Sequence, residues 1–223
     1  MIEQRTDKQK VYWEKERRRR SPDHPAIAAF ARPKIEYIVK LICIRKEQKI
    51  LDVGCGNGFF TYYFSEICDP VGLDFSRRML SINPSEKLVQ GTANSLPFSD
   101  ESFDVVFCSN LLHHARDPRD MVEEMKRVSR GYVILSEPNR NNPLMALFSA
   151  IIAEERGALK FSLRYMEDLA KTCGLDVIDS CSMGSIVPNK TPPSMLKLFC
   201  LVDWRMPLGF YNLVVAQKQE MTD

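Results

Sequence analysis

The fold of this 223-residue chain is decided by the stretch Ile50-Leu51-Asp52-Val53-Gly54-Cys55-Gly56-Asn57-Gly58-Phe59-Phe60. An apolar segment of strand length is followed by three alternating glycines and then by apolar residues in a helix-like pattern. Glycines at such a junction let the backbone approach a ligand closely. The stretch therefore predicts a strand, a turn that cradles a nucleotide, and a helix.

The spacing of the glycines distinguishes between nucleotide ligands. A dinucleotide-binding turn has the form G-x-G-x-x-G, whereas Gly54, Gly56 and Gly58 alternate strictly. Asp52 precedes them, and its carboxylate would repel a pyrophosphate. We therefore expect a ligand that brings a cationic group to this turn.

Further strand-sized apolar segments follow, and helical patterns separate most of them. This alternation is typical of an α/β fold with a parallel sheet and right-handed crossovers. Two more strands, after a helical region, predict a C-terminal hairpin. The expected strands are residues 49–53, 70–73, 87–90, 104–109, 132–136, 176–182 and 210–215.

Helices are predicted from apolar residues at helical spacing. Residues 26–44 form one such pattern, which we expect to restart after Pro33. The stripe at 121, 125 and 128 predicts a helix whose methionines fill the core. Two later helices are expected over 144–156 and 162–173, the second ending at Gly174.

Residues 48–138 resemble the class I S-adenosylmethionine-dependent methyltransferases, and most closely the type 11 family that includes the ubiquinone and menaquinone C-methyltransferases. Asp52 to Gly58 match that family's acidic-apolar-Gly-x-Gly-x-Gly motif. Its other motifs are matched in order by Val71-Gly72-Leu73-Asp74, Leu96-Pro97-Phe98, Ser102-Phe103-Asp104-Val105-Val106, Leu111-Leu112-His113-His114 and Glu123-Glu124-Met125-Lys126-Arg127-Val128.

The resemblance implies a Rossmann-like, seven-stranded, mostly parallel sheet with helices on both faces and an antiparallel last strand. It also implies S-adenosylmethionine as the cofactor and S-adenosylhomocysteine as its product. We expect one methyltransferase domain over residues 1–223. Its parts are a helical N-terminal segment (1–45), a cofactor-binding half (46–138) and a substrate-side half (139–223).

The cofactor-binding residues are carried over from the family motifs. Asp74 ends the second strand, where a carboxylate accepts both ribose hydroxyls; the alternative is that it caps the helix that follows. Thr92-Ala93 stands where the family has an acidic residue and Ala at the adenine edge, so the partner of adenine is uncharged here. The candidate residues are Asp52, Gly54, Cys55, Gly56, Asn57, Gly58, Asp74, Phe75, Thr92, Ala93, Ser109 and Asn110.

No residue is assigned as catalytic. A sulfonium cofactor supplies its own leaving group, so the protein mainly aligns the acceptor and excludes water. His113 and His114 are candidate general bases, and Glu137 is another. Each also has a structural interpretation: the histidines pack in the core or frame the cofactor, and Glu137 caps a helix or pairs with a cation.

The composition limits the classes of partner, metal site and membrane segment that we expect. The net charge of +2, from 31 basic and 29 acidic residues, gives no global attraction to nucleic acid or anionic lipid. The seven cysteines are scattered without a C-x-x-C pair, which argues against disulfides and against a zinc or other metal site and favours the cytoplasm. No apolar run reaches the roughly 18 residues of a membrane span.

Two other functions stay open beside methyl transfer to a small molecule. The first is a tRNA-modifying methyltransferase, because some wobble-uridine enzymes carry a similar glycine motif and the run Arg17–Arg20 would suit phosphates; that run also fits a solvated helix face. The second is a regulatory subunit that binds the cofactor without turnover. Substrate choice is expected in the segments around Tyr12-Trp13, Leu144–Lys160 and Ile186–Leu208, while the acceptor, the atom methylated and the oligomeric state stay open.

Overall fold

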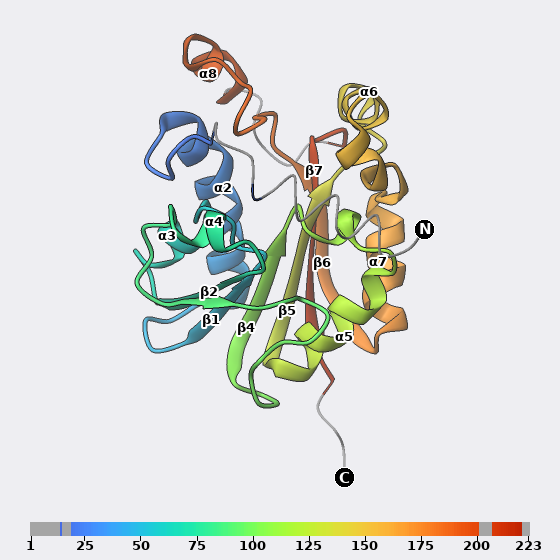
Figure 1. Ribbon diagram of the computed structural model, residues 1–223. Coiled ribbons are helices and arrows are strands. Elements are labelled where there is room, and N and C mark those ends of the chain that lie inside the picture. The colour runs from blue at the N-terminus through green and yellow to red at the C-terminus, as the bar shows by residue number, and fades with distance from the viewer. Residues whose placement is uncertain (1–13, 15–18, 201–206, 220–223) are drawn as a thin grey trace.

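A computed structural model describes residue 14 and residues 19–200 and 207–219. One seven-stranded sheet has the order β3-β2-β1-β4-β5-β7-β6 (Figure 1). β1 to β5 are mutually parallel, and β7 runs antiparallel to both β5 and β6, so the predicted sheet and its C-terminal hairpin are confirmed. The strands are β1 (Lys49–Val53), β2 (Asp69–Asp74), β3 (Leu88–Gln90), β4 (Phe103–Ser109), β5 (Ser129–Pro138), β6 (Leu175–Met183) and β7 (Tyr211–Lys218).

Helices cover both faces of the sheet. The described α-helices are α2 (Pro25–Ile42), α3 (Thr61–Phe64), α4 (Arg77–Leu80), α5 (Pro118–Val128), α6 (Pro143–Ile151), α7 (Leu163–Thr172) and α8 (Leu196–Cys200). Three 3₁₀ helices join them: η1 (Leu112–His114), η2 (Ala153–Lys160) and η3 (Pro193–Met195). Within the described part of the chain, every helix is too short or too polar to span a bilayer.

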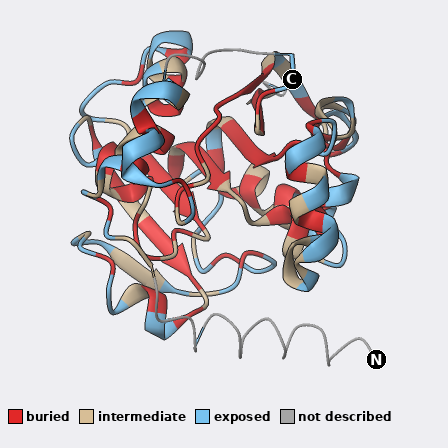
Figure 2. Cartoon of the chain, turned by 90° about the horizontal axis from the view of Figure 1, so that it is seen from above, coloured by how far each residue is buried: buried red, intermediate tan, exposed pale blue. Residues whose placement is uncertain are grey.

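The alternating side chains of the central strands create two cores. Val105 and Phe107 of β4 face the core shared with α2 and α3, whereas Val106 and Cys108 face the core shared with α5 and α7. Seen from above, buried residues fill the interior and exposed ones lie on the outer helix surfaces (Figure 2). Burial on both faces explains why the central strands are nearly continuous apolar runs.

Helix α2 continues through Pro33, so the predicted restart is wrong. Pro33 has no N–H to donate to the Ala29 carbonyl, which weakens this turn. The buried side chain of Lys34 supplies a donor at the neighbouring position, since its Nζ lies 2.8 Å from the Phe30 carbonyl oxygen. Packing of the apolar face of α2 on the sheet holds the helix together across the proline.

The segment after β5 also differs from the prediction. α6 ends at Ile151, and the chain continues as the 3₁₀ helix η2, where we expected one helix to residue 156. η2 lies against η1 so closely that a Cβ atom on Gly157 would come within 1.8 Å of the His113 carbonyl oxygen. Helix α7 follows as predicted, and Gly174 ends it with a φ of +70°. β5 begins at Ser129, three residues before the expected start at residue 132.

The loop between β3 and β4 is fastened to α5 by Arg127. Its guanidinium donates to the carbonyl oxygens of Leu96 and Phe98 at 3.0 and 2.9 Å. It also pairs with Glu124 and Asp100, each at 2.7 Å. One planar side chain therefore fixes the loop that carries the candidate adenine-contacting residues.

We expect Arg127→Ala to lower the free energy of unfolding by about 1 to 3 kcal/mol, because it removes several charge-assisted hydrogen bonds at once. Chemical denaturation measures this change. Arg130→Ala is the matched control, since Arg130 is 58% exposed and pairs with Asp104 at 3.1 Å, so its loss costs less than about 1 kcal/mol. Equal effects of the two substitutions would contradict the special role of Arg127.

Candidate active site

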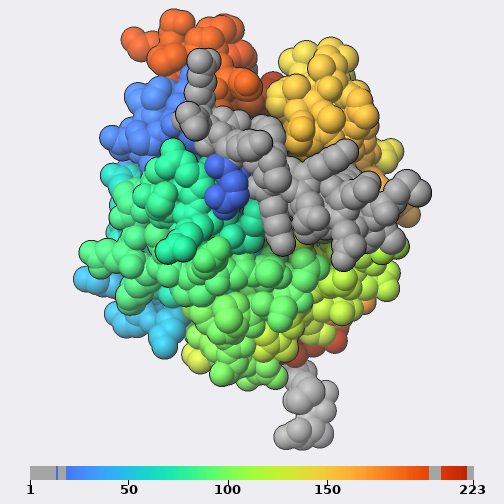
Figure 3. Space-filling model, in the orientation of Figure 1, coloured from blue at the N-terminus to red at the C-terminus, as the bar shows by residue number. Residues whose placement is uncertain are grey.

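A cavity of about 680 Å³ lies at the carboxyl ends of β1, β2 and β4. The segments of α8 (orange) and α6 (gold) project as two separate masses at this end of the molecule (Figure 3). In a parallel sheet with this strand order, ligands bind at this edge, where the chain leaves β1 and β4 in opposite directions. The cavity is therefore the candidate active site.

The glycine turn after β1 forms one wall of the cavity. Gly54, Gly56 and Gly58 all have positive φ angles, of +74°, +52° and +92°. A Cβ atom on Gly56 would meet no described residue within 4 Å, so among the described residues the backbone there borders open space. A Cβ atom on Gly54 would instead meet Leu111, and one on Gly58 would meet Asn83. Gly56 is thus the glycine at which a ligand can approach the backbone closely.

Asp74, at the end of β2, joins this turn to the start of α4. Its Oδ2 accepts from the Gly56 amide and its Oδ1 from the Ser76 amide, both at 2.8 Å. Burial raises the pKa of Asp74, and these two amides act in the opposite direction. Each carboxylate oxygen keeps further lone pairs, and the residue lines the cavity. Contact with the start of a helix and contact with a ligand are therefore compatible.

Ser109 and Asn110, at the end of β4, bring polar atoms to the cavity. The buried Ser109 Oγ and Asn110 Oδ1 find no hydrogen-bond partner among the described residues. Asn110 also has a φ of +53°, a backbone conformation that is strained for a residue with a side chain. Buried polar atoms without partners cost about 1 to 3 kcal/mol each, so a ligand that donates hydrogen bonds fits here.

Eleven of the twelve candidate cofactor-binding residues line the cavity, and Gly58 does not. The lack of a side chain at Gly58 makes room for Asn83, whose amide donates to the Gly56 carbonyl oxygen at 3.1 Å. Met121, expected in the core, is a cavity residue. Pro188 and Asn189 also line the cavity and belong to the segment Ile186–Leu208, where substrate choice was expected, and Arg19 belongs to the arginine run. Asn94 is a lining residue that sequence reasoning missed, because no local pattern marks it.

Residues 51–135 match a family of proteins described as a methyltransferase domain. The chain is 38% identical over 101 residues to the uncharacterized methyltransferase YcgJ of Bacillus subtilis, which covers 41% of this chain and 40% of the relative. It is 34% identical over 129 residues to demethylmenaquinone methyltransferase of Staphylococcus aureus, with 52% and 53% covered. The chain thus spans about half the length of these curated relatives.

The sequence match therefore covers residues 51–135 of this chain, and solved methyltransferase structures share its fold. A methyltransferase from Thermotoga maritima, described as a possible histamine N-methyltransferase, superposes with a TM-score of 0.64 at 20% identity and covers 86% of this chain and 99% of its own. A putative methyltransferase of Haloferax volcanii, in complex with the activator Trm112, superposes with a TM-score of 0.68 at 17% identity, covering 87% and 92%.

His113 and His114 are adjacent in sequence but have different surroundings. His113 is buried, and its Nδ1 lies 2.5 Å from Glu137 Oε2 and its Nε2 3.1 Å from Glu155 Oε2. Burial alone would lower the pKa of His113, but the two carboxylates outweigh it and raise the pKa to about 10. Burial and the neighbouring His113 lower the pKa of His114 to about 3. His114 lines the cavity and His113 does not.

Glu137 has the structural role that was its alternative interpretation. It is fully buried and does not line the cavity. Its Oε1 accepts from the amides of Leu111 and Leu112 at 2.8 and 2.6 Å. Glu137 thus caps the first turn of η1 and pairs with His113, and this geometry favours the structural interpretation over a general base.

One interpretation of residues 17–20 was a solvated helix face. Arg20, which the structure describes, does not fit it. Arg17 and Arg18 lie outside the described residues. Arg20 donates to the carbonyl oxygens of Pro188 and Thr191 at 2.7 and 2.8 Å, and Asn57 of the glycine turn donates to the Arg20 carbonyl oxygen at 2.9 Å. Arg20 therefore connects the segment before α2 to the glycine turn after β1.

Asp52 is a buried acid on the cavity wall. Its Oδ2 accepts from the Thr61 hydroxyl at 2.6 Å, and its side chain lines the cavity beneath the glycine turn. Burial raises the pKa of Asp52 to about 7, and the hydrogen bond from Thr61 opposes this shift only in part. A cationic ligand group in the cavity would favour the ionised form.

This shift predicts a pH dependence of stability. The folded protein holds a proton on Asp52 up to about pH 7, whereas the unfolded chain releases it near pH 3.8. Stability of the ligand-free protein therefore falls as the pH rises from about 4 to 7, by up to about 4 kcal/mol from this group. We expect Asp52→Asn to remove that part of the slope, measured by denaturant unfolding at each pH.

Asp69→Asn provides the control for this measurement. Asp69 lies at the exposed start of β2, and its side chain is 60% exposed. Its substitution leaves the slope between pH 4 and 7 close to that of the wild type. A wild-type slope that persists in Asp52→Asn would contradict the raised pKa of Asp52.

Proposed function

We propose that this chain is an S-adenosylmethionine-dependent methyltransferase that methylates a small molecule. The open space at Gly56, whose amide is held by the carboxylate of Asp74, is the observation that carries the proposal. It gives a ligand access to the backbone at the motif that defines the matched domain. The polar atoms of Ser109 and Asn110 fit the same ligand from the end of β4.

The residues present can hold each part of the cofactor. Asp74 would accept the ribose hydroxyls, and Thr92-Ala93 would border the adenine. The glycine turn, Asp52 and the end of β4 would hold the cationic methionine part, where a carboxylate and unpaired oxygens favour positive charge. The bound cofactor supplies an electrophilic methyl group on a sulfonium. The protein then acts mainly by orientation and by exclusion of water.

The residues near the end of β4 leave little room for a strong general base. His113 holds a proton up to about pH 10 and is buried away from the cavity. His114 faces the cavity but is a weak base, because its pKa is about 3. The acceptor is therefore expected to be a group that is already nucleophilic, or one that ionises readily near neutral pH.

A small acceptor is favoured over RNA by two observations. The volume of the cavity lies within the range of small-molecule sites. Of the two described arginines of the run, Arg20 is engaged with backbone carbonyl oxygens inside the chain, and Arg19 lines the cavity. The curated relative named as a demethylmenaquinone methyltransferase points the same way, toward a small-molecule acceptor.

The cofactor proposal predicts stabilisation by S-adenosylhomocysteine. At about 100 times its dissociation constant the ligand adds roughly 2.7 kcal/mol, which raises the unfolding midpoint of a chain of this size by about 5 to 11 °C. NAD at the same concentration leaves the midpoint unchanged. Thermal unfolding of protein freed of copurified ligand measures both, and a flat response to S-adenosylhomocysteine would overturn the proposal.

A matched pair of substitutions on β2 tests the role of Asp74. Asp74→Asn removes the carboxylate at the cavity, whereas Asp69→Asn removes an exposed one at the other end of the same strand. We expect Asp74→Asn to weaken binding of S-adenosylhomocysteine at least about tenfold, or 1.4 kcal/mol, by calorimetry. Asp69→Asn binds as the wild type. Unchanged binding in Asp74→Asn would withdraw the ribose assignment but not the cofactor.

Turnover separates the three functions that stay open. With methyl-labelled cofactor, we expect label to pass to the small-molecule fraction of a cell extract, in an amount insensitive to ribonuclease and to moderate salt. Label in the RNA fraction, lost as salt rises, would favour a tRNA-modifying enzyme. Tight cofactor binding with no transfer to any fraction would favour a regulatory subunit.

A further inference from the structure

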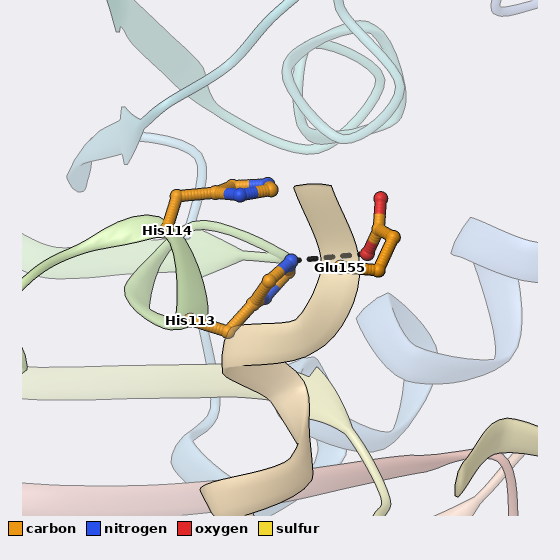
Figure 4. A group of neighbouring side chains, drawn as sticks. All are labelled: His113, His114 and Glu155. Carbon is orange, nitrogen blue, oxygen red and sulfur yellow. Dashed lines mark hydrogen bonds and ion pairs between the residues drawn. The ribbon is translucent and has the colours of Figure 1, made fainter. Parts of the chain in front are cut away.

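Three potential metal ligands converge beside the cavity. His113 and His114 come from η1 and Glu155 comes from η2, and their side chains point toward one another (Figure 4). One ligand atom from each residue lies within 4.8 Å of the other two. The rings of His113 and His114 have their centroids 3.9 Å apart. Two imidazoles and one carboxylate are donors that suit a transition-metal ion.

One pair of donor atoms has a separation close to that of a metal site. His113 Nε2 and Glu155 Oε2 lie 3.1 Å apart. Two donors each about 2.05 Å from a tetrahedral zinc ion are about 3.3 Å apart. A shift of a few tenths of an ångström would thus replace the shared proton between these atoms by a metal ion.

Both imidazoles have a second partner that sets their orientation. Nδ1 of His113 lies 2.5 Å from Glu137 Oε2, which leaves Nε2 facing Glu155. His114 forms a hydrogen bond with the backbone of Glu154. A histidine ligand commonly donates its other ring N–H to a carboxylate or a backbone carbonyl, and such partners fix its tautomer.

Charge also favours a divalent cation. The cluster contains two carboxylates, Glu137 and Glu155, against two imidazoles. A divalent ion bound with both histidines neutral would balance these two negative charges. Arg19 also acts electrostatically on Glu155 and His114, and it is the competing cation at this position.

Tight packing holds the two halves of the cluster together. Gly157 lies two residues beyond Glu155 and contacts the His113 backbone so closely that no side chain fits there. This contact keeps η2 against η1 and Glu155 beside His113. The arrangement is therefore a built feature of the fold, because it depends on buried packing as well as on the three side chains.

We propose that His113 Nε2, His114 and Glu155 bind one divalent transition-metal ion of the zinc type. A set of two histidines and one glutamate leaves a fourth position for water or another oxygen ligand. His114 also lines the large cavity, so the site adjoins the place where the acceptor would bind. The proposal does not depend on methyl transfer, because it rests on these side chains alone.

The test uses the full-length, tag-free protein, treated with a chelator and then titrated with Zn²⁺ by calorimetry. We expect one equivalent to bind. Co²⁺ in its place is expected to give the visible absorption of a four-coordinate site with nitrogen and oxygen ligands. Glu155→Gln and His114→Asn are each expected to weaken Zn²⁺ binding at least about 100-fold, more than the usual loss of an outer-shell partner.

Two substitutions control for general effects. Glu154→Gln changes the adjacent glutamate of η2, and His24→Asn removes a histidine outside the cluster, at the N-cap of α2. Both are expected to bind Zn²⁺ as the wild type. Circular dichroism verifies folding of every variant, and the wild-type stoichiometry decides the question if a variant fails to fold.

Three results would overturn the proposal. The first is a wild-type protein that binds no Zn²⁺ in the micromolar range. The second is equal binding in Glu155→Gln, His114→Asn and the two controls. The third is a Co²⁺ spectrum with intense sulfur charge-transfer bands, which would assign the ion to the free cysteines. None of these results bears on cofactor binding, which the S-adenosylhomocysteine measurement tests separately.

Discussion

The site depends on the fully buried carboxylate of Glu137 at the end of β5. A carboxylate without contact with water is stable only when its oxygens are hydrogen-bonded or paired with a cation. Glu137 meets this demand with the amides of Leu111 and Leu112 and with the ring of His113. The start of η1 is thereby fixed to the end of β5, and with it the wall that Leu111 and His114 contribute to the cavity.

The opposite wall depends on a second buried acid. Asp74 holds the amide of Gly56, so the positive φ angles of the glycine turn are stabilised from the neighbouring strand as well as by the local sequence. Asn83 supports the same turn from the other side through the Gly56 carbonyl oxygen. The ends of β1, β2 and β4 therefore form one rigid frame around the cavity, a prerequisite for accurate orientation of a cofactor and an acceptor.

Burial shifts the pKa values of Asp52, His113 and His114 in different directions, depending on the partners of each group. Asp52 has a raised pKa because it is desolvated with one hydroxyl partner, and it is poised to ionise when a cation arrives. His113 has a raised pKa because two carboxylates overcome its desolvation. His114 has a lowered pKa because it is buried and lies beside His113. Neighbours in sequence thus have opposite chemistry, and the difference arises from Glu137 and Glu155.

Local patterns in the sequence determined the succession of the strands and main helices along the chain, the glycine turn and the end of α7. Strand β1 was predicted with its observed bounds, because apolar runs and glycines act within a few residues. The family motifs placed Asp74, Ser109 and Asn110 at the ends of strands, and all three line the cavity. Positions that depend on strand ends were predictable because parallel strands finish at one edge.

Only the tertiary structure decided the partners of those residues. α2 continues through Pro33 because its apolar face packs on the sheet, and the path of η2 follows from the close contact of Gly157 with His113. His113 meets Glu137 and Glu155, 24 and 42 residues away, while Arg20 meets Pro188 across 168 residues. No local pattern encodes such contacts, because they arise when separate elements pack and buried polar groups must find partners.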